Sequence, residues 1–166
     1  IHWRDWSSDV CSSDLRCKMY CGEKNQMYSA MSEELARMYN AAGRREESLA
    51  CHLAVRNQLL KNGYREGSLL LMVDNNMSVV YLDLGRPEEA IPYLTEALEL
   101  TKENGLVGSA VAEPTWNLAR VYRALGDEEK EDIYLKAAVE GFRECYPPEH
   151  PKRIAAEQRL KERQEE

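Results

Sequence analysis

The sequence is short of positive charge, of long apolar runs and of signals for a membrane or secretion. Its 22 Lys and Arg are outnumbered by 29 Asp and Glu, so the formal net charge is −7. Direct binding to nucleic acid or to an acidic membrane relies on clustered cations, and we expect neither. No apolar run approaches the roughly 18 residues of a membrane span, and no signal-peptide core is visible near the start. We therefore expect a cytoplasmic protein.

Phenylalanine and ordered cysteine patterns are also scarce. A single Phe beside nine Tyr predicts amphipathic packing surfaces in place of one large aromatic core. The five Cys are irregularly spaced in a chain rich in helix formers, which favours reduced thiols over a disulfide framework.

What the chain does contain is an internal repeat. The segment LARMYNAAGRREES begins at Leu35, MSVVYLDLGRPEEA at Met77 and LARVYRALGDEEKE at Leu118, so the copies start 42 and then 41 residues apart. A tyrosine and a glycine recur at fixed places in each copy, at Tyr39, Tyr81 and Tyr122 and at Gly43, Gly85 and Gly126. Matched columns at a near-constant period predict a repeated structural unit.

The second copy shows what one unit is. Val73, Met77 and Val80 recur at helical spacing and make one apolar stripe. Gly85 then allows the left-handed backbone that ends many helices, and Pro87 suits the first turn of another. The unit is therefore predicted to be a hairpin of two antiparallel helices.

These columns resemble the tetratricopeptide repeat, in the extended form of about 42 residues that is similar to kinesin light chains and bacterial regulators. The resemblance implies an all-α fold, a right-handed α-solenoid of antiparallel hairpins. We expect three repeats, at about 27–63, 66–105 and 108–145, and a capping helix at about 150–163. Together they form one domain over 27–164.

The individual helices are predicted near 27–41, 45–61, 66–84, 87–103, 108–125, 128–144 and 150–163. Pro114 should either kink its helix or mark a later start. Ile154, Ala155 and Leu160 are expected to form the apolar side of the capping helix, with basic residues behind them.

Three positions depart from the family pattern. The packing alanine of the second helix is Ser48 in the first copy and Glu131 in the third, and the large residue of that helix is His52 in the first copy. These departures bear on local packing.

Residues 1–15 have a composition unlike the rest of the chain. Asp5 to Leu15 resemble the translation of a short-read sequencing adapter, so we expect 1–15 to be a disordered, non-native scar. Residues 16–26 would be the remnant of a preceding repeat. The natural protein is then expected to be longer at its N-terminus, where a domain that decides its role could lie.

The resemblance also implies where a ligand binds. First helices of such hairpins line a concave groove, and the residue before each large position should face it. Those residues are Glu34, Asn76 and Asn117, and in the extended families an Asn there binds the backbone of a peptide. An amide both donates and accepts, which suits that role.

Further along the same helices lie Arg37, Arg120 and Arg123, and Trp116 precedes Asn117. The arginines favour an acidic or C-terminal carboxylate ligand at the third repeat. Trp116 is either an aromatic anchor for the partner or a residue buried against the preceding repeat.

The function predicted from these features is a protein-interaction scaffold that binds an extended peptide or a partner helix. An alternative is the ligand-sensing segment of a larger bacterial regulator whose effector domain lies upstream. Oligomerisation is possible, because an edge hairpin exposes apolar surface. No cofactor and no direct nucleic-acid partner are expected.

Two chemical alternatives carry less weight. Cys17, Cys21, Cys51 and His52 could be zinc ligands, but their spacing is not that of a zinc motif and the last two are adjacent on a helix. Cys145 near His150 is the only local pair that could supply a nucleophile and a base. We expect neither a metal site nor an enzyme.

Overall fold

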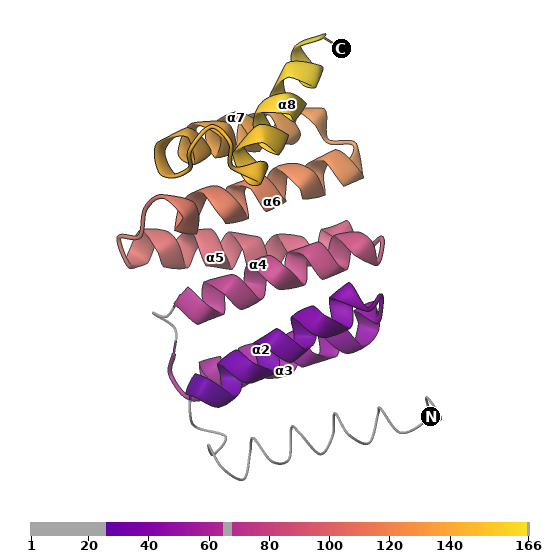
Figure 1. The fold of residues 1–166 in the computed structure, drawn as a ribbon, viewed down its shortest axis with the longest axis vertical. Helices are drawn as coiled ribbons and strands as arrows, with labels where there is room; N and C mark the ends of the chain where they lie inside the picture. The colour runs from indigo at the N-terminus through magenta and orange to yellow at the C-terminus, as the bar shows by residue number, and fades with distance from the viewer. Residues whose placement is uncertain (1–25, 65–67, 166) are drawn as a thin grey trace. The chain divides into compact units, whose positions relative to one another are not determined.

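The computed structural model describes residues 26–64 and 68–165, and within these ranges the regular structure is entirely helical (Figure 1). The elements are α2 (Gln26–Ala41), α3 (Arg45–Lys61), α4 (Ser68–Asp83), η1 (Pro87–Ala90), α5 (Ile91–Glu103), α6 (Ser109–Leu125), α7 (Glu128–Cys145) and α8 (Pro151–Glu165). None of these described helices is long and apolar enough to cross a membrane. The predictions for residues 1–15, for 16–25 and for Cys17 and Cys21 lie outside the described residues.

The helices lie where the apolar periodicity placed them. One refinement concerns the second helix of the middle hairpin, which opens with the 3-10 turn η1 at Pro87 before α5 begins. Another concerns Pro114, which lies inside α6 because that helix already begins at Ser109. A later start of the helix at Pro114 was therefore wrong.

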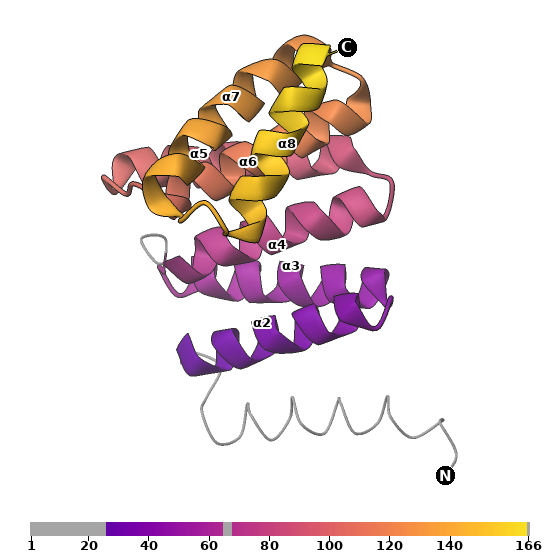
Figure 2. The ribbon, with the colours of Figure 1, turned by 45° about the horizontal axis from the view of Figure 1, so that its top comes forward.

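The chain divides into two compact units, residues 1–65 and 66–166. In the described part of the first unit, α2 packs against α3 as a hairpin. In the second unit α4 packs against α5, α6 contacts both of them, α7 packs against α6, and α8 packs against α7 (Figure 2). This unit therefore contains two successive hairpins and a further helix on the last one.

The three aligned glycines end helices in the same way. Gly43, Gly85 and Gly126 have φ values of +75°, +70° and +73°, a left-handed backbone that costs glycine little. In each hairpin the N–H after the glycine donates to the carbonyl of the repeat tyrosine, as Arg44 does to Tyr39 at 2.9 Å. This is the Schellman arrangement, which satisfies carbonyls that the helix end leaves open. The turn is therefore a repeated structural device.

A cation lies over the same tyrosine in every hairpin. The distances to the ring centroid are 4.5 Å for Arg44 over Tyr39, 5.5 Å for Arg86 over Tyr81 and 4.9 Å for Lys130 over Tyr122. Each turn also contains an ion pair between two residues that are three positions apart. The basic residue comes first in the first two hairpins and second in the third, so the cation over the tyrosine comes three residues later there. The ring keeps its cation although the sequence order of the charges is reversed.

The two residues of the first hairpin that depart from the family pattern have polar partners within that hairpin. Ser48 is fully buried, and its hydroxyl donates to the carbonyl of Ala36 across the α2–α3 contact at 2.7 Å. His52 is 1% exposed, and its Nδ1 lies 2.7 Å from a carboxylate oxygen of the equally buried Glu33. A buried polar group with a partner costs far less than one without, so these residues fit the fold.

The residue of the third hairpin that departs from the family pattern has its partner on another helix. Glu131 of α7 stands where the middle hairpin has Ala90, and its carboxylate accepts from the guanidinium of Arg159 of α8 at 2.7 and 3.2 Å. The Arg159 side chain is 12% exposed and that of Glu131 is 4% exposed. The capping helix therefore completes the polar packing of the third hairpin.

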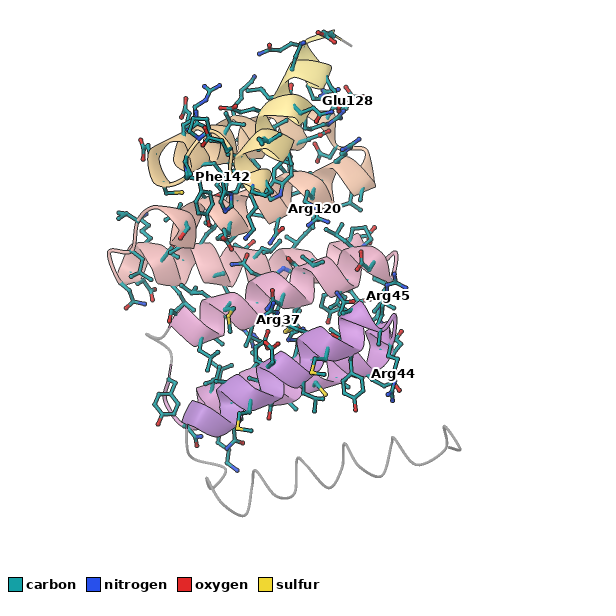
Figure 3. All side chains as sticks on the ribbon, in the orientation of Figure 1. Arg37, Arg44, Arg45, Arg120, Glu128 and Phe142 are labelled. Atoms are coloured by element: carbon teal, nitrogen blue, oxygen red, sulfur yellow. The ribbon has the colours of Figure 1, made fainter. Side chains whose placement is uncertain are left out.

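The predicted apolar side of α8 was wrong. Ile154 is 48% exposed and Ala155 is exposed, whereas Ala156 is fully buried and Leu160 half-buried. Arg163 extends from α8 to Asp132 and to Glu128 at the start of α7, which is labelled in Figure 3. Acidic residues on α7 thus turn the arginine side of α8 inward, and Ile154 faces outward.

Candidate protein-interaction site

Three of the predicted ligand-binding residues line one pocket of the second unit. Trp116, Arg120 and Arg123 lie at successive turns of α6 and border a small pocket of ≈ 90 Å³. Its other walls come from Ala119 of α6, from Glu131 and Leu135 of α7 and from Arg159 of α8. These three predicted residues thus form one wall of a pocket that three helices build.

Trp116 contributes an aromatic ring to the lining of this pocket. Its ring meets Phe142 of α7, which is labelled in Figure 3, edge-on, with ring centroids 6.4 Å apart and planes at 63°. Phe142 is fully buried. Trp116 is only partly buried against this core, so its ring both packs inward and borders the pocket. A rigid aromatic ring held in this way is the kind of residue that often anchors a protein interface.

Asn117 forms part of a polar network linking α6 to α4. Its amide N–H donates to the side-chain oxygen of Asn75 at 3.1 Å, and its own oxygen accepts from the guanidinium of Arg120 at 3.3 Å. Asn117 is 8% exposed. An amide has two N–H donors and two oxygen lone pairs, so each end retains one hydrogen-bonding place beyond these two contacts. Asn75 was not singled out from the sequence.

Arg120 lies in a partly desolvated position. Burial lowers the pKa of its guanidinium, and the field of the Asp83 carboxylate offsets part of that effect. An arginine remains protonated under such conditions, so the positive charge of Arg120 lies in surroundings that contain little water. An anion at this place would interact more strongly with Arg120 than with a fully solvated arginine.

Arg159 is the residue of the site that sequence reasoning missed. It lies on the capping helix, 36 residues beyond Arg123, and only the fold brings the two side chains to one pocket. The signal that could have found it was Glu131, an acid in a column of small packing residues. A buried acid there requires a cation from a neighbouring element.

The remaining predicted residues lie elsewhere. Asn76 is half-buried on α4. Glu34 and Arg37 belong to α2 in the first unit, where they pair with each other at 2.9 Å and are both more than half exposed. An exposed pair of this kind contributes little to stability, which leaves both side chains available to a ligand.

The residues behind the two chemical alternatives are engaged in structural contacts. His52 is the partner of Glu33, and neither of the described cysteines, Cys51 and Cys145, is in a disulfide. Burial raises the pKa of the Cys145 thiol, which disfavours the reactive thiolate. His150 stacks on Tyr146 with ring centroids 3.7 Å apart. Among the described residues no three His, Cys, Asp or Glu side chains group as metal ligands would.

Comparison with solved structures shows the fold. The TPR-like repeats of a Podosopora anserina protein assigned as a kinesin light chain superpose with a TM-score of 0.72 at 21% identity, covering 92% of this chain and 72% of that one. A point variant of those repeats gives 0.74 at the same identity and coverage. The BtubC (BKLC) protein from P. vanneervenii gives 0.68 at 19% identity, covering 83% of this chain and 63% of that one. The fold class is thus the all-α solenoid of helical hairpins.

No curated protein matches the chain. The comparison with sequence families agrees with the fold assignment. The sequence profile of the tetratricopeptide repeat matches residues 26–103 and again 68–144. These two matches overlap across α4 and α5 and together cover the chain from the start of α2 to the last turn of α7. The chain belongs to the tetratricopeptide repeat family, whose folds generally mediate protein–protein interaction and are typically non-catalytic scaffolds.

Proposed function

We propose that this protein is an interaction scaffold whose first helices bind an extended peptide or a partner helix. The observation that supports this most directly is the set of side chains that α6 presents. Trp116, Arg120 and Arg123 border one pocket, and Asn117 lies beside them with hydrogen-bonding capacity to spare. A rigid aromatic ring, two guanidinium groups and an amide form a surface suited to a peptide chain.

Asn76 is the second element of the proposed groove. It precedes Met77 on α4 as Asn117 precedes Leu118 on α6, so the two amides occupy equivalent places in successive hairpins of one unit. In the proposed complex each amide bonds a backbone group of the ligand. Glu34 holds the corresponding place on α2 of the first unit, with Arg37 one turn further along that helix.

The test is the selection of a binding peptide from a displayed random library on the full chain, followed by Kd measurements. We expect Asn76→Ala and Asn117→Ala each to weaken binding of that peptide by about tenfold, the loss of one to two hydrogen bonds. The matched control is Asn57→Ala, since Asn57 is exposed on the second helix of a hairpin. An unchanged Kd in both groove variants would reject the proposal.

A further inference from the structure

The amide of Asn117, on α6, is held between two side chains of opposite hydrogen-bonding character. Its N–H donates to the side-chain oxygen of Asn75 on α4 at 3.1 Å, and its oxygen accepts from the guanidinium of Arg120 at 3.3 Å. Arg120 lies one turn further along α6 and is labelled in Figure 3. Because Asn117 is only 8% exposed, these two neighbours, and not bulk water, determine how its amide is turned.

The arginine fixes the polarity of this chain of hydrogen bonds. A guanidinium has only donors, so the atom of the Asn117 amide that faces Arg120 is the oxygen. The amide nitrogen then faces α4, where the oxygen of Asn75 is its acceptor. An amide turned the other way would place its N–H groups against those of Arg120. The sequence of donors from Arg120 through Asn117 to Asn75 therefore runs in one direction.

Helix α4 acts on both ends of this chain of hydrogen bonds. Burial lowers the pKa of the Arg120 guanidinium, and the field of the Asp83 carboxylate on α4 raises it. Asp83 therefore attracts Arg120 at one end, while Asn75 accepts from Asn117 at the other. The orientation of the Asn117 amide on α6 is thus set largely by residues of the preceding first helix.

Asn75 occupies a column whose residue differs in each hairpin. Glu33 holds this place in the first hairpin and pairs within that hairpin, and Trp116 holds it in the third. In the middle hairpin the place equivalent to the partner of Glu33 is taken by Leu94, whose buried side chain can neither donate nor accept. The hydrogen bond of Asn75 instead reaches Asn117 of the next hairpin, 42 residues along the chain.

We propose that Asn75 is a positioning residue for ligand binding, which holds the Asn117 amide ready to donate to a carbonyl and to accept from an N–H of the bound chain. The inference rests on the proposed function, because Asn75 prepares the ligand contact that Asn117 makes there. An amide that is already held does not have to be ordered on binding, and ordering such a side chain weakens affinity by about three- to tenfold. Asn75 thus contributes to affinity without touching the ligand.

The test uses the peptide selected on the full chain and two replacements of Asn75. Asn75→Leu keeps the size of the side chain but removes the acceptor, and it should weaken binding by about three- to tenfold. Asn75→Asp keeps an acceptor in the same shape and should restore most of the affinity. Asn57→Leu makes the same change at an exposed place on α3 and is the matched control. A Kd that Asn75→Leu leaves unchanged, or that both replacements weaken equally, would overturn the inference.

A double variant separates positioning from direct contact with the ligand. If Asn75 acts through Asn117, Asn75→Leu should have no further effect on the Kd once Asn117→Ala has removed the amide. Additive losses in Asn75→Leu/Asn117→Ala would mean that Asn75 touches the ligand itself, and the positioning role would be wrong.

The orientation of the amide can also be followed without a ligand. The NMR signals of the Asn117 side-chain N–H groups are identified by their loss in Asn117→Ala. In Asn75→Leu they should shift and exchange faster with water, and in Asn75→Asp they should stay close to those of the wild type. Unaltered signals in Asn75→Leu would overturn the inference. Leucine at this position does not threaten the fold, because Trp116 fills the same column in the third hairpin.

The two proposals fail in different ways. If Asn117→Ala weakens the selected peptide while Asn75→Leu does not, the groove stands and the positioning role is wrong. If neither variant weakens the peptide although the amide signals respond to Asn75→Leu, Asn117 is not a ligand contact. Asn75 then serves only the packing of α6 on α4, and the inference falls with the contact on which it rests.

Discussion

The first and third hairpins are built on the same repeat, yet they place polar residues in its packed columns in different ways. The first encloses its polar pair within the hairpin, between Glu33 and His52. The third has apolar residues at those places, Trp116 and Leu135, and instead carries Glu131, which is paired from outside by α8. The same backbone thus tolerates a buried charge wherever a neighbour supplies its partner.

The two hairpins also differ in how well their first helices are covered. Val121 of α6 is fully buried, whereas Met38, its equivalent on α2, is 54% exposed. Pro114 of α6 is buried, whereas Met31, its equivalent on α2, is exposed. In a stacked array neighbouring elements cover each first helix, and these exposures show that α6 is more fully covered than α2. The recognition surface that we propose lies on α6, the more fully covered of the two helices.

The largest expected effect comes from breaking the buried pair of the first hairpin. His52→Leu removes the imidazole from a carboxyl group that is itself 1% exposed, and we expect a loss of about 3 to 5 kcal/mol in unfolding free energy. The double variant Glu33→Asn/His52→Leu copies Asn75 and Leu94 of the middle hairpin and should recover most of that loss. Urea unfolding of both variants measures the difference. Equal losses would show that the pairing is not what stabilises this site.

A smaller effect separates the two first helices α2 and α6. Leu118→Ala should cost about 3 kcal/mol, because Leu118 is 1% exposed and its removal leaves a cavity. The same change at Leu35, the equivalent residue on the half-exposed face of α2, should cost about 1 kcal/mol. Both values come from urea midpoints with a common slope. If the two costs agree, α2 is as well packed as α6 and the difference in coverage between these two helices does not affect stability.

The sequence predicted the hairpins well because their determinants are local. Apolar spacing fixes each helix, and Gly43, Gly85 and Gly126 fix where three of them end, each with a left-handed backbone. These signals lie within a few residues of their effect. The bounds of α3 and the end of α6 consequently agree with the predicted ranges.

The sequence could not predict contacts between elements far apart in the chain. Glu33 and His52 are 19 residues apart, and Glu131 and Arg159 are 28 apart, so neither pairing has a periodic signal. The face of α8 was misjudged for the same reason. Ile154 and Leu160 are six residues apart and do not share a helical face, whereas Ala156 and Leu160 do. The acidic surface of α7 decides which face turns inward, and helical periodicity carries no information about it.

A third prediction concerns how α8 is held. Its contacts with α7 are largely ionic, including Arg163 to Asp132 at 3.0 Å and Arg143 to Glu157 at 2.7 Å, with Ala156 as its one fully buried side chain among the described residues. We expect high salt to raise amide hydrogen exchange in α8 several-fold while α3, which has an apolar core, changes little. Uniform protection at low and high salt would show that apolar contacts hold α8.

The same helix should respond to acid. The arginine partners lower the pKa of Asp132 from 3.8 and that of Glu157 from 4.5. A carboxyl group with a lowered pKa in the folded state stabilises that state above its unfolded value, and the contribution disappears as the pH falls through the folded value. We therefore expect α8 to keep its protection above about pH 5 and to lose it progressively below about pH 4. Arg163→Gln should weaken that response, and an unaltered profile in this variant would remove the ionic explanation.

The smallest expected effect tests the turns. Asp127 at the start of α7 accepts from the backbone N–H of Lys130 at 3.1 Å, whereas Arg44 at the start of α3 makes no side-chain cap. Arg44→Asp/Glu47→Lys gives the first hairpin the turn of the third, with a cap added and a cation still above Tyr39. An N-cap hydrogen bond is worth more than an exposed ion pair, so the melting temperature should rise by a few degrees. Arg44→Asp alone adds the cap but removes the cation, and its smaller gain would separate the two contributions. A lower melting temperature in the double variant would mean that the order of charges in each turn is fixed by its own surroundings and is not interchangeable between repeats.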